Sequence, residues 1–427
     1  MGREDIKDVL KEWNYYELPE IKDRKLNPLE FLNWKLKKII SLVGFRRTGK
    51  TFLLLSIAKR MGKENAIYVN FEDKRLCDID FSDFLNVLRE VYGNKKMILL
   101  LDEVQNIDDW GRWLRTLNDL PDYFIFATGS SSKISLEEIP TELRGRTLSL
   151  RVFPLDFEEF LNFKGKSKEI PRGFLFKYLE EYLTFGGLPE IVLENNNMKK
   201  MLMAEEYFNT FVARDVIEKY DVENKKALNY IIRYLINSSY LTYSKLYNSM
   251  KSCGYKIGKG TVIDYTNYIE RSFFAYFLPI YSSVKKQEQY PRKVYIIDNI
   301  FLRFGINMSF GRLMENLVFV ELLRRKCCVT DFQFNYFQTR GGYEVDFLIK
   351  EGLRVKQLIQ VTYANSFDEV EHREIRALLK AKEMFKEDNP ELLIITWDYE
   401  DEKELSWFGK KGKIKFVPLW KWLLKDL

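Results

Sequence analysis

Histidine and cysteine are scarce in this chain of 427 residues, which holds one histidine and four cysteines. With His372 alone, catalytic triads and histidine-based metal sites are practically excluded. The cysteines, Cys77, Cys253, Cys327 and Cys328, lack the paired spacing of a zinc site. We interpret them as free thiols of a reducing cytosol, which predicts a cytoplasmic location.

Long apolar segments are also lacking. No run approaches the length of a membrane span, and residues 1–5 are charged where a signal peptide would be apolar. We therefore expect no membrane partner. Apolar residues make up 46% and charged residues 30% of the chain, which is typical of a globular protein. The net charge of +6 permits nucleic-acid binding without requiring it.

The most informative stretch is an apolar run, residues 39–43, that leads directly into a G-x-x-x-x-G-K-T pattern. This Walker A pattern predicts a strand, a loop whose backbone N–H groups surround phosphates, and a helix whose N-terminus faces the same anion. Lys50 is expected to contact the β and γ phosphates, and the Thr51 hydroxyl to ligate Mg²⁺. The predicted ATP-binding residues are Gly44, Phe45, Arg46, Arg47, Thr48, Gly49, Lys50 and Thr51.

A second apolar run, residues 97–101, ends in Asp102 and Glu103. Five successive apolar residues predict a parallel strand buried on both faces, and ligands gather at the carboxyl ends of such strands. We expect Asp102 to hold Mg²⁺ and Glu103 to polarise the attacking water, as in a Walker B segment. The alternative is that the two acids merely end a strand.

A third predicted strand, residues 124–129, has a hydroxyl-rich tip. Thr128 or Ser130 is placed to bond the γ phosphate or the water; the alternative is a helix cap. Just beyond, Arg144 and Arg146 are candidates for an arginine finger, although surface arginines usually have no such role. If either acts on a second copy, the protein must be a homo-oligomer.

Residues 155–222 are predicted to form a helical lid that closes over the nucleotide edge. The expected helices are Asp156–Phe163, Phe174–Thr184 and Met198–Ile217. In the last of them Arg214 is a candidate second sensor of phosphate, and an ion pair with Asp215 or Glu218 is the alternative.

Residues 223–285 have the spacing of a winged helix, with a wing strand expected at Phe273–Ile280. Recognition helices reach double-stranded DNA with their N-terminal residues, here Lys256, Lys259 and Thr261. Further phosphate contacts are expected from Lys285, Lys286, Arg292 and Lys293. The alternative is a winged helix that serves only protein packing.

Taken together, these motifs resemble the archaeal ATPase family of the AAA+ class. The segments that carry the resemblance are Gly44–Thr51, Leu101–Gln105, Ala127–Ser130, Arg144–Arg146, Gly186–Glu190 and Ala213–Val216. The resemblance implies an ATPase without implying a task.

The C-terminal part, residues 286–427, resembles the PD-(D/E)xK nuclease core in its order of helix, acid-bearing strand and polar-tipped strand. Asp346 fits the first position of that motif. Gln360 and Thr362 stand where Glu and Lys are expected, and one carboxylate with a neutral amide is a poor magnesium site. We interpret this domain as a non-catalytic relic that is still a DNA or protein platform, with an active nuclease as the alternative.

The sequence thus predicts an α/β fold in five parts. These are an N-terminal leader (1–36), an AAA+ P-loop core with a parallel sheet (37–154), a lid (155–222), a winged helix (223–285) and a restriction-endonuclease-like domain (286–427). We expect an ATPase with ATP and Mg²⁺ as cofactors that acts as a nucleotide-driven switch on DNA. The alternative is a signalling ATPase whose C-terminal half binds proteins and has no nucleic-acid role.

Overall fold

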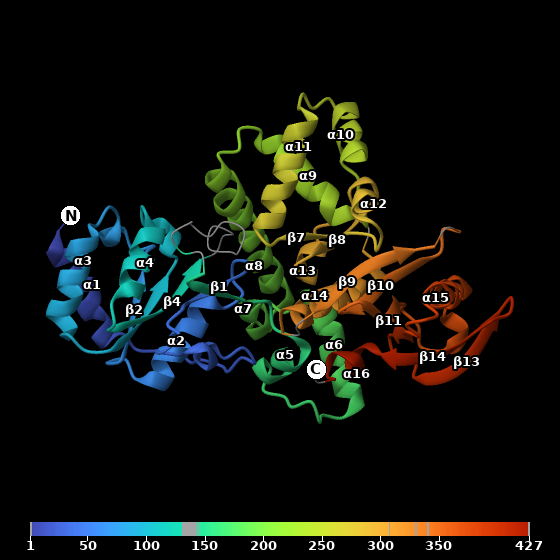
Figure 1. The fold of residues 1–427 in the computed structure, drawn as a ribbon, viewed down its shortest axis with the longest axis horizontal. Helices are drawn as coiled ribbons and strands as arrows, with labels where there is room; N and C mark the ends of the chain where they lie inside the picture. Colours follow the sequence, from blue (N-terminus) through green and yellow to red (C-terminus); the bar gives the residue numbers. More distant parts are fainter. Residues whose placement is uncertain are drawn as a thin grey trace. The chain divides into compact units, whose positions relative to one another are not determined.

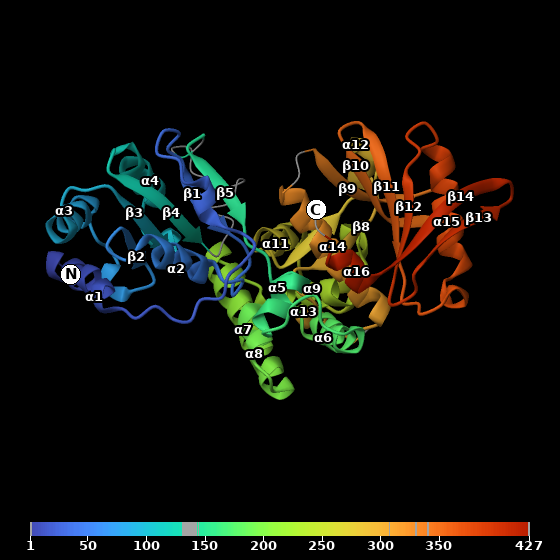
Figure 2. The same ribbon diagram turned by 90° about the horizontal axis from the view of Figure 1, so that it is seen from below.

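The chain forms two compact units in a computed structural model that describes residues 2–129, 143, 145–306, 308–328, 331–339 and 341–425. Unit 1 comprises Met1–Phe153 with Arg271–Phe273, and unit 2 comprises Pro154–Glu270 with Phe274–Leu427. Figures 1 and 2 show their elements from two directions. Two of the predicted site residues, Ser130 and Arg144, lie outside the described residues.

Unit 1 is built on a five-stranded sheet of order β2-β3-β4-β1-β5, in which all neighbours are parallel. Its strands are β1 (Ile39–Val43), β2 (Ala66–Asn70), β3 (Met97–Asp102), β4 (Tyr123–Gly129) and β5 (Thr147–Arg151). Every residue of β1, β3 and β4 is buried, because helices cover both faces. The sheet confirms the predicted α/β class.

Unit 1 has four α-helices among its described residues, and the first of them is formed by the expected N-terminal leader. They are α1 (Arg3–Tyr15), α2 (Lys50–Met61), α3 (Phe81–Tyr92) and α4 (Trp110–Asp119). Helix α1 packs against α3 and β2, and its apolar face buries Ile6, Leu10 and Trp13. The Trp13 indole Nε1 donates to the Ala66 carbonyl at 3.1 Å. The leader is therefore an integral layer of unit 1.

Unit 2 begins with the helices of the expected lid. They are α5 (Phe157–Phe163), α6 (Arg172–Phe185), α7 (Pro189–Leu193), α8 (Asn197–Thr210) and a π-helical segment, η6 (Phe211–Glu218). Helix α6 packs against α13 (Asn299–Leu302), α14 (Phe310–Cys328) and α16 (Leu419–Leu423). The segment is thus integrated into unit 2, and closure over a nucleotide stays a prediction.

A module of helices and a small sheet follows in unit 2. Its elements are α9 (Lys225–Asn237), β6 (Tyr240–Leu241), α10 (Tyr243–Ser252), α11 (Lys259–Arg271), β7 (Ala275–Leu278), α12 (Val284–Gln289) and β8 (Arg292–Ile296). Strand β8 is central and antiparallel to both neighbours. The module therefore extends past residue 285, because its middle strand comes last in the sequence.

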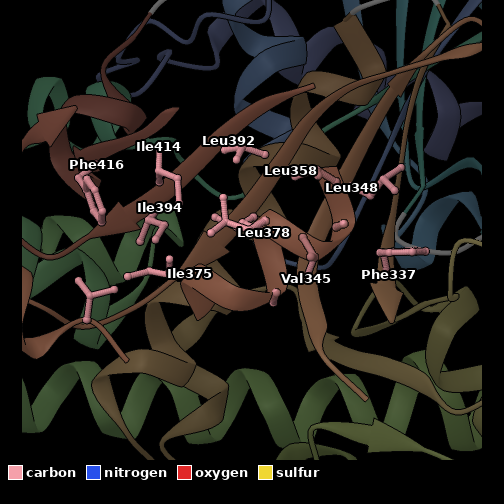
Figure 3. Packing of buried hydrophobic residues seen from close by; sticks show 14 of the residues in the cluster. Phe337, Val345, Leu348, Leu358, Ile375, Leu378, Leu392, Ile394, Ile414 and Phe416 are labelled. Atoms are coloured by element: carbon pink, nitrogen blue, oxygen red, sulfur yellow. The ribbon is translucent and has the colours of Figure 1, made fainter. Parts of the chain in front are cut away.

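The remaining chain forms a mixed six-stranded sheet of order β13-β14-β12-β11-β10-β9. Its strands are β9 (Phe332–Gln338), β10 (Glu344–Glu351), β11 (Arg354–Val361), β12 (Glu391–Thr396), β13 (Asp401–Trp407) and β14 (Lys410–Pro418). Helix α15 (His372–Met384) covers one face, where Leu378 packs with Leu348 and Leu358 (Figure 3). A register shift between Val345 and Leu348 marks a bulge in β10.

Replacing Trp13 with Ala tests whether α1 is an integral part of unit 1. Trp13 is 3% exposed, so we expect the variant to lower the free energy of unfolding of unit 1 by about 3–5 kcal/mol. Chemical denaturation followed by circular dichroism measures this loss. The control is Tyr15→Ala on the same helix, where the side chain is 86% exposed and a change within about 0.5 kcal/mol is expected. Equal stability of both variants would show that α1 is a dispensable leader.

Candidate nucleotide site at the strand ends of unit 1

The loop after β1 depends on glycine at two positions. A side chain on Gly44 would place its Cβ 2.2 Å from the Val152 carbonyl oxygen, so only glycine permits this close approach. Gly49 has φ +94° and begins α2 in a left-handed conformation that favours glycine. The backbone therefore makes the sharp turn that the Walker A pattern predicts.

Lys50 lies across this loop and is largely buried. Its ammonium group donates to the carbonyl oxygens of Gly44 at 3.0 Å and Phe45 at 3.1 Å. The Thr48 hydroxyl also donates to the Phe45 carbonyl, at 2.8 Å. These bonds hold the positive charge at the mouth of the loop.

Asp102 is the centre of the site and is 2% exposed. Its Oδ2 accepts hydrogen bonds from the hydroxyls of Thr51 and Tyr68, both at 2.8 Å, and its Oδ1 accepts one from Thr128. Burial raises the pKa of Asp102, and Glu103 adds to the rise, while the three hydroxyl donors oppose it. The predicted magnesium ligands Thr51 and Asp102 are thus in direct contact.

Glu103 follows directly and has a left-handed backbone, with φ +52°. Its backbone N–H donates to the Thr128 hydroxyl at 3.1 Å, and the Gln105 side-chain amide donates to its carboxylate. Thr128 is therefore engaged with the acids of β3. The Thr128 hydroxyl donates to Asp102, and its expected bond to the γ phosphate or the water stays a prediction.

Arg146 lies at the amino ends of the strands, opposite the carboxyl ends where Asp102 lies. It precedes β5, whose first residue Thr147 is paired with Ile39 at the amino end of β1. The Arg146 guanidinium is 3.8 Å from Asp119, and its carbonyl accepts from the Ile39 N–H. Within its own unit Arg146 cannot reach phosphates at the carboxyl ends. A finger role toward a second copy stays a prediction.

Arg24 and Tyr68 are site residues that the sequence did not single out. The Arg24 guanidinium donates to the carbonyls of Thr48 and Phe153, both at 3.0 Å, which ties the N-terminal segment to the loop. The basic run at residues 22–25 was visible in the sequence, but no local pattern connects it with a loop more than twenty residues away. Only the folded chain brings them together.

The second predicted centre, around Asp346, lies in unit 2. The Asp346 carboxylate accepts from the Lys293 ammonium at 2.8 Å and from the Val361 N–H at 3.0 Å. Gln360 of β11 bonds the backbone of β10 and not the Asp346 carboxylate. Its side-chain amide accepts from the Asp346 N–H and donates to the Glu344 carbonyl. Among the described residues no group of three or more potential ligand side chains is arranged to hold a metal ion.

The lysines expected to contact DNA fall into two classes. Lys256, Lys259, Lys285 and Lys286 are exposed. Lys293 is buried within a group of carboxylates, so its expected phosphate contact is wrong. Arg214, on η6, lines an open surface hollow of unit 2 together with Glu206 and Glu218.

No helix in the described ranges has the length and apolar character needed to cross a bilayer.

Three family models match successive segments of the chain. A family described as AAA domain matches residues 36–161, and two domains of unknown function, DUF8612 and DUF4143, match residues 176–308 and 310–421. Among solved structures, the Walker-type ATPase PABY2304 of Pyrococcus abyssi aligns with a TM-score of 0.44 and 14% identity, over 71% of this chain and 95% of that one.

Two curated relatives, both uncharacterized, cover nearly the whole chain. The protein from Haemophilus influenzae is 26% identical over 88% of this chain and 93% of its own length. Protein MJ1544 of Methanocaldococcus jannaschii is 38% identical over 401 residues, which is 91% of this chain and 88% of that protein. The AAA-domain match confirms the predicted AAA-type P-loop core. The chain therefore belongs to the same protein family as MJ1544, and in it an AAA domain precedes the domains DUF8612 and DUF4143.

Proposed function

We propose that unit 1 binds ATP with Mg²⁺ at the carboxyl ends of β1 and β3 and hydrolyses it. The observation that carries this proposal is the 2.8 Å hydrogen bond between the Thr51 hydroxyl and the Asp102 carboxylate, beside Lys50 and the loop N–H groups. A hydroxyl and a carboxylate are the hard oxygen ligands that Mg²⁺ prefers. The residues present therefore fit this ion, which when bound would neutralise charge on the β and γ phosphates.

We assign a different role in hydrolysis to each of these side chains. Lys50 would exchange its two carbonyl acceptors for phosphate oxygens, and Thr51 and Asp102 would hold the metal. Glu103 accepts a proton from the attacking water as general base. Gln105 and Thr128 position Glu103 through its carboxylate and its backbone N–H.

Two substitutions separate binding from chemistry. Lys50→Ala removes the phosphate contact, so we expect ATP binding and turnover to fall together below detection. Glu103→Gln keeps the shape of the site but removes the base, so binding should persist within about threefold while turnover falls by roughly 10²–10⁴. Calorimetric titration with ATP and a phosphate-release assay measure the two quantities. Undiminished hydrolysis in Lys50→Ala would remove the basis of the proposal.

Arg24 offers an independent test of the loop geometry. Arg24→Gln loses the charged donor to Thr48 and Phe153, so we expect the KM for ATP to rise on the order of tenfold or more with a smaller change in kcat. Lys35→Gln, an exposed change in the same N-terminal segment, is the matched control. A KM that does not differ between the two variants would mean that Arg24 leaves the loop geometry unaffected.

A second proposed function is double-stranded DNA binding by the helix-and-sheet module of unit 2. Its order of helix, strand, two helices and strand, followed by the short helix α12 and strand β8, is consistent with a winged helix. Exposed lysines lie just before α11, at its first residue and within α12. Helix α11 would enter the major groove with its N-terminal end, where Lys259 lies, while α12 contacts the backbone. Nucleotide state in unit 1 would then set the DNA affinity of unit 2.

DNA binding predicts a steep dependence on salt. Each phosphate neutralised contributes about −0.9 to the slope of log affinity against log salt concentration. We expect alanine at all four exposed lysines to weaken binding and flatten the slope by roughly 3–4; these are Lys256, Lys259, Lys285 and Lys286. Fluorescence anisotropy with duplex DNA measures both effects. Alanine at Lys386, in the turn after α15, and at Lys411 of β14 is the control, because both lysines are exposed.

A slope near zero in the unmodified protein would reject DNA binding. It would favour the alternative in which unit 2 binds a protein partner and nucleic acid has no role.

A further inference from the structure

The interior of unit 2 contains a lysine surrounded by carboxylates from other elements. The Lys293 ammonium lies 2.8 Å from Glu315 of α14, 2.9 Å from Glu344 of β10 and 2.8 Å from Asp346 of β10. Its side chain is 5% exposed. An ammonium group has three N–H donors: two of them donate to Glu315 and Asp346, and Glu344 is in ion-pair contact with the same nitrogen. These four residues are called the Lys293 cluster below.

Each carboxylate of the cluster has a further donor that fixes it. Tyr295 donates to Glu315 at 2.7 Å, Tyr240 donates to Glu344, and the Val361 N–H donates to Asp346. Because these donors come from the small sheet and from β11, the cluster is a closed network. Buried ion groups are retained only where hydrogen bonds compensate their lost hydration, and this condition is met here.

Lys293 is the cation in contact with all three carboxylates, and Arg312 is a second positive charge that acts on Glu315. Burial acts to raise the pKa of Glu315, but Lys293, Tyr295 and Arg312 outweigh it and lower the pKa below its ordinary value. Burial, helped by Asp346, raises the pKa of Glu374 to about 8, which favours the neutral form of this acid at pH 7.

The alternation of β10 explains how Asp346 reaches the cluster, because Glu344 and Asp346 are two residues apart and share the face opposite Val345. The register shift between Val345 and Leu348 marks a bulge, after which Leu348 returns to the apolar layer under α15. Lys293 approaches from β8, whose backbone pairs with both β6 and β7. The cluster thus joins the small sheet, α14 and the six-stranded sheet at one point.

We propose that the Lys293 ammonium permanently occupies the place where a nuclease of PD-(D/E)xK type would hold a metal, and that it clamps the small sheet onto the C-terminal sheet. The distances of 2.8–2.9 Å from the Lys293 nitrogen to the three carboxylates are those of charged N–H···O contacts, so the ammonium itself fills the space between them. The module that carries α11 and α12 then moves together with the C-terminal sheet. This inference does not depend on ATP hydrolysis or DNA binding.

Thermal unfolding of the full chain without nucleotide tests the clamp. Lys293→Met should lower the Tm of unit 2 by on the order of 10 °C, because three carboxylates then lack their cation. Adding Asp346→Asn should restore part of the loss by removing one like charge. Lys285→Met, an exposed change nearby, should shift Tm by less than about 2 °C.

If Lys293→Met gives no folded protein, the yield of folded double variant replaces Tm as the readout, and a gain over the single variant supports the clamp. An unchanged Tm in Lys293→Met, or a double variant no better than the single one, overturns it.

Occupancy by the ammonium is tested on the protein with native Lys293, using MnCl₂ as the probe. We expect Mn²⁺ to shift the Tm of the wild type and of Asp346→Asn equally, and duplex DNA to remain uncut. A Mn²⁺-dependent rise in Tm, or a Mn²⁺-dependent cleavage of DNA, that Asp346→Asn abolishes would place a metal in the cluster and overturn the proposal.

Discussion

The contact between Thr51 and Asp102 is the constraint on which the rest of unit 1 depends. The two residues are 51 positions apart, yet their side chains bond at 2.8 Å. They meet because β1 and β3 run parallel on either side of β4, so their carboxyl ends share one edge. Strand β4 supplies Thr128 between them. A buried carboxylate with three hydroxyl donors has a fixed orientation, and this fixes where a metal and its phosphates would bind.

The motifs of unit 1 were predictable because phosphate binding needs consecutive residues. The glycine turn, the lysine and the hydroxyl residue must follow one another in the phosphate-binding loop. A strand that is buried on both faces must be apolar along its whole length. The position of Arg146 was not predictable in the same way. The segment after it, Thr147–Arg151, was not predicted as a strand, so nothing in the local sequence indicated that Arg146 precedes β5 at its amino end. Long-range partners such as Arg24 and Tyr68 leave no local pattern.

Unit 2 shows the same division between local and long-range information. Apolar spacing predicted the lid helices and the wing strand, whereas β6, β8, β13 and β14 were not predicted. The departures at Gln360 and Thr362 were visible in the sequence. Lys293 was expected to be a surface contact because neighbouring residues are basic. Its environment is set by Glu315, Glu344 and Asp346, which lie 22 to 53 positions away. A buried lysine and an exposed lysine look alike until the chain is folded.

The account of unit 1 is tested most directly by calorimetric binding of a non-hydrolysable ATP analogue with and without Mg²⁺, in the wild type and in Asp102→Asn. The account predicts that Mg²⁺ strengthens binding to the wild type by at least about tenfold, and that Asp102→Asn abolishes most of this gain because the metal loses its carboxylate ligand. An identical gain in both proteins would contradict the central role of Asp102.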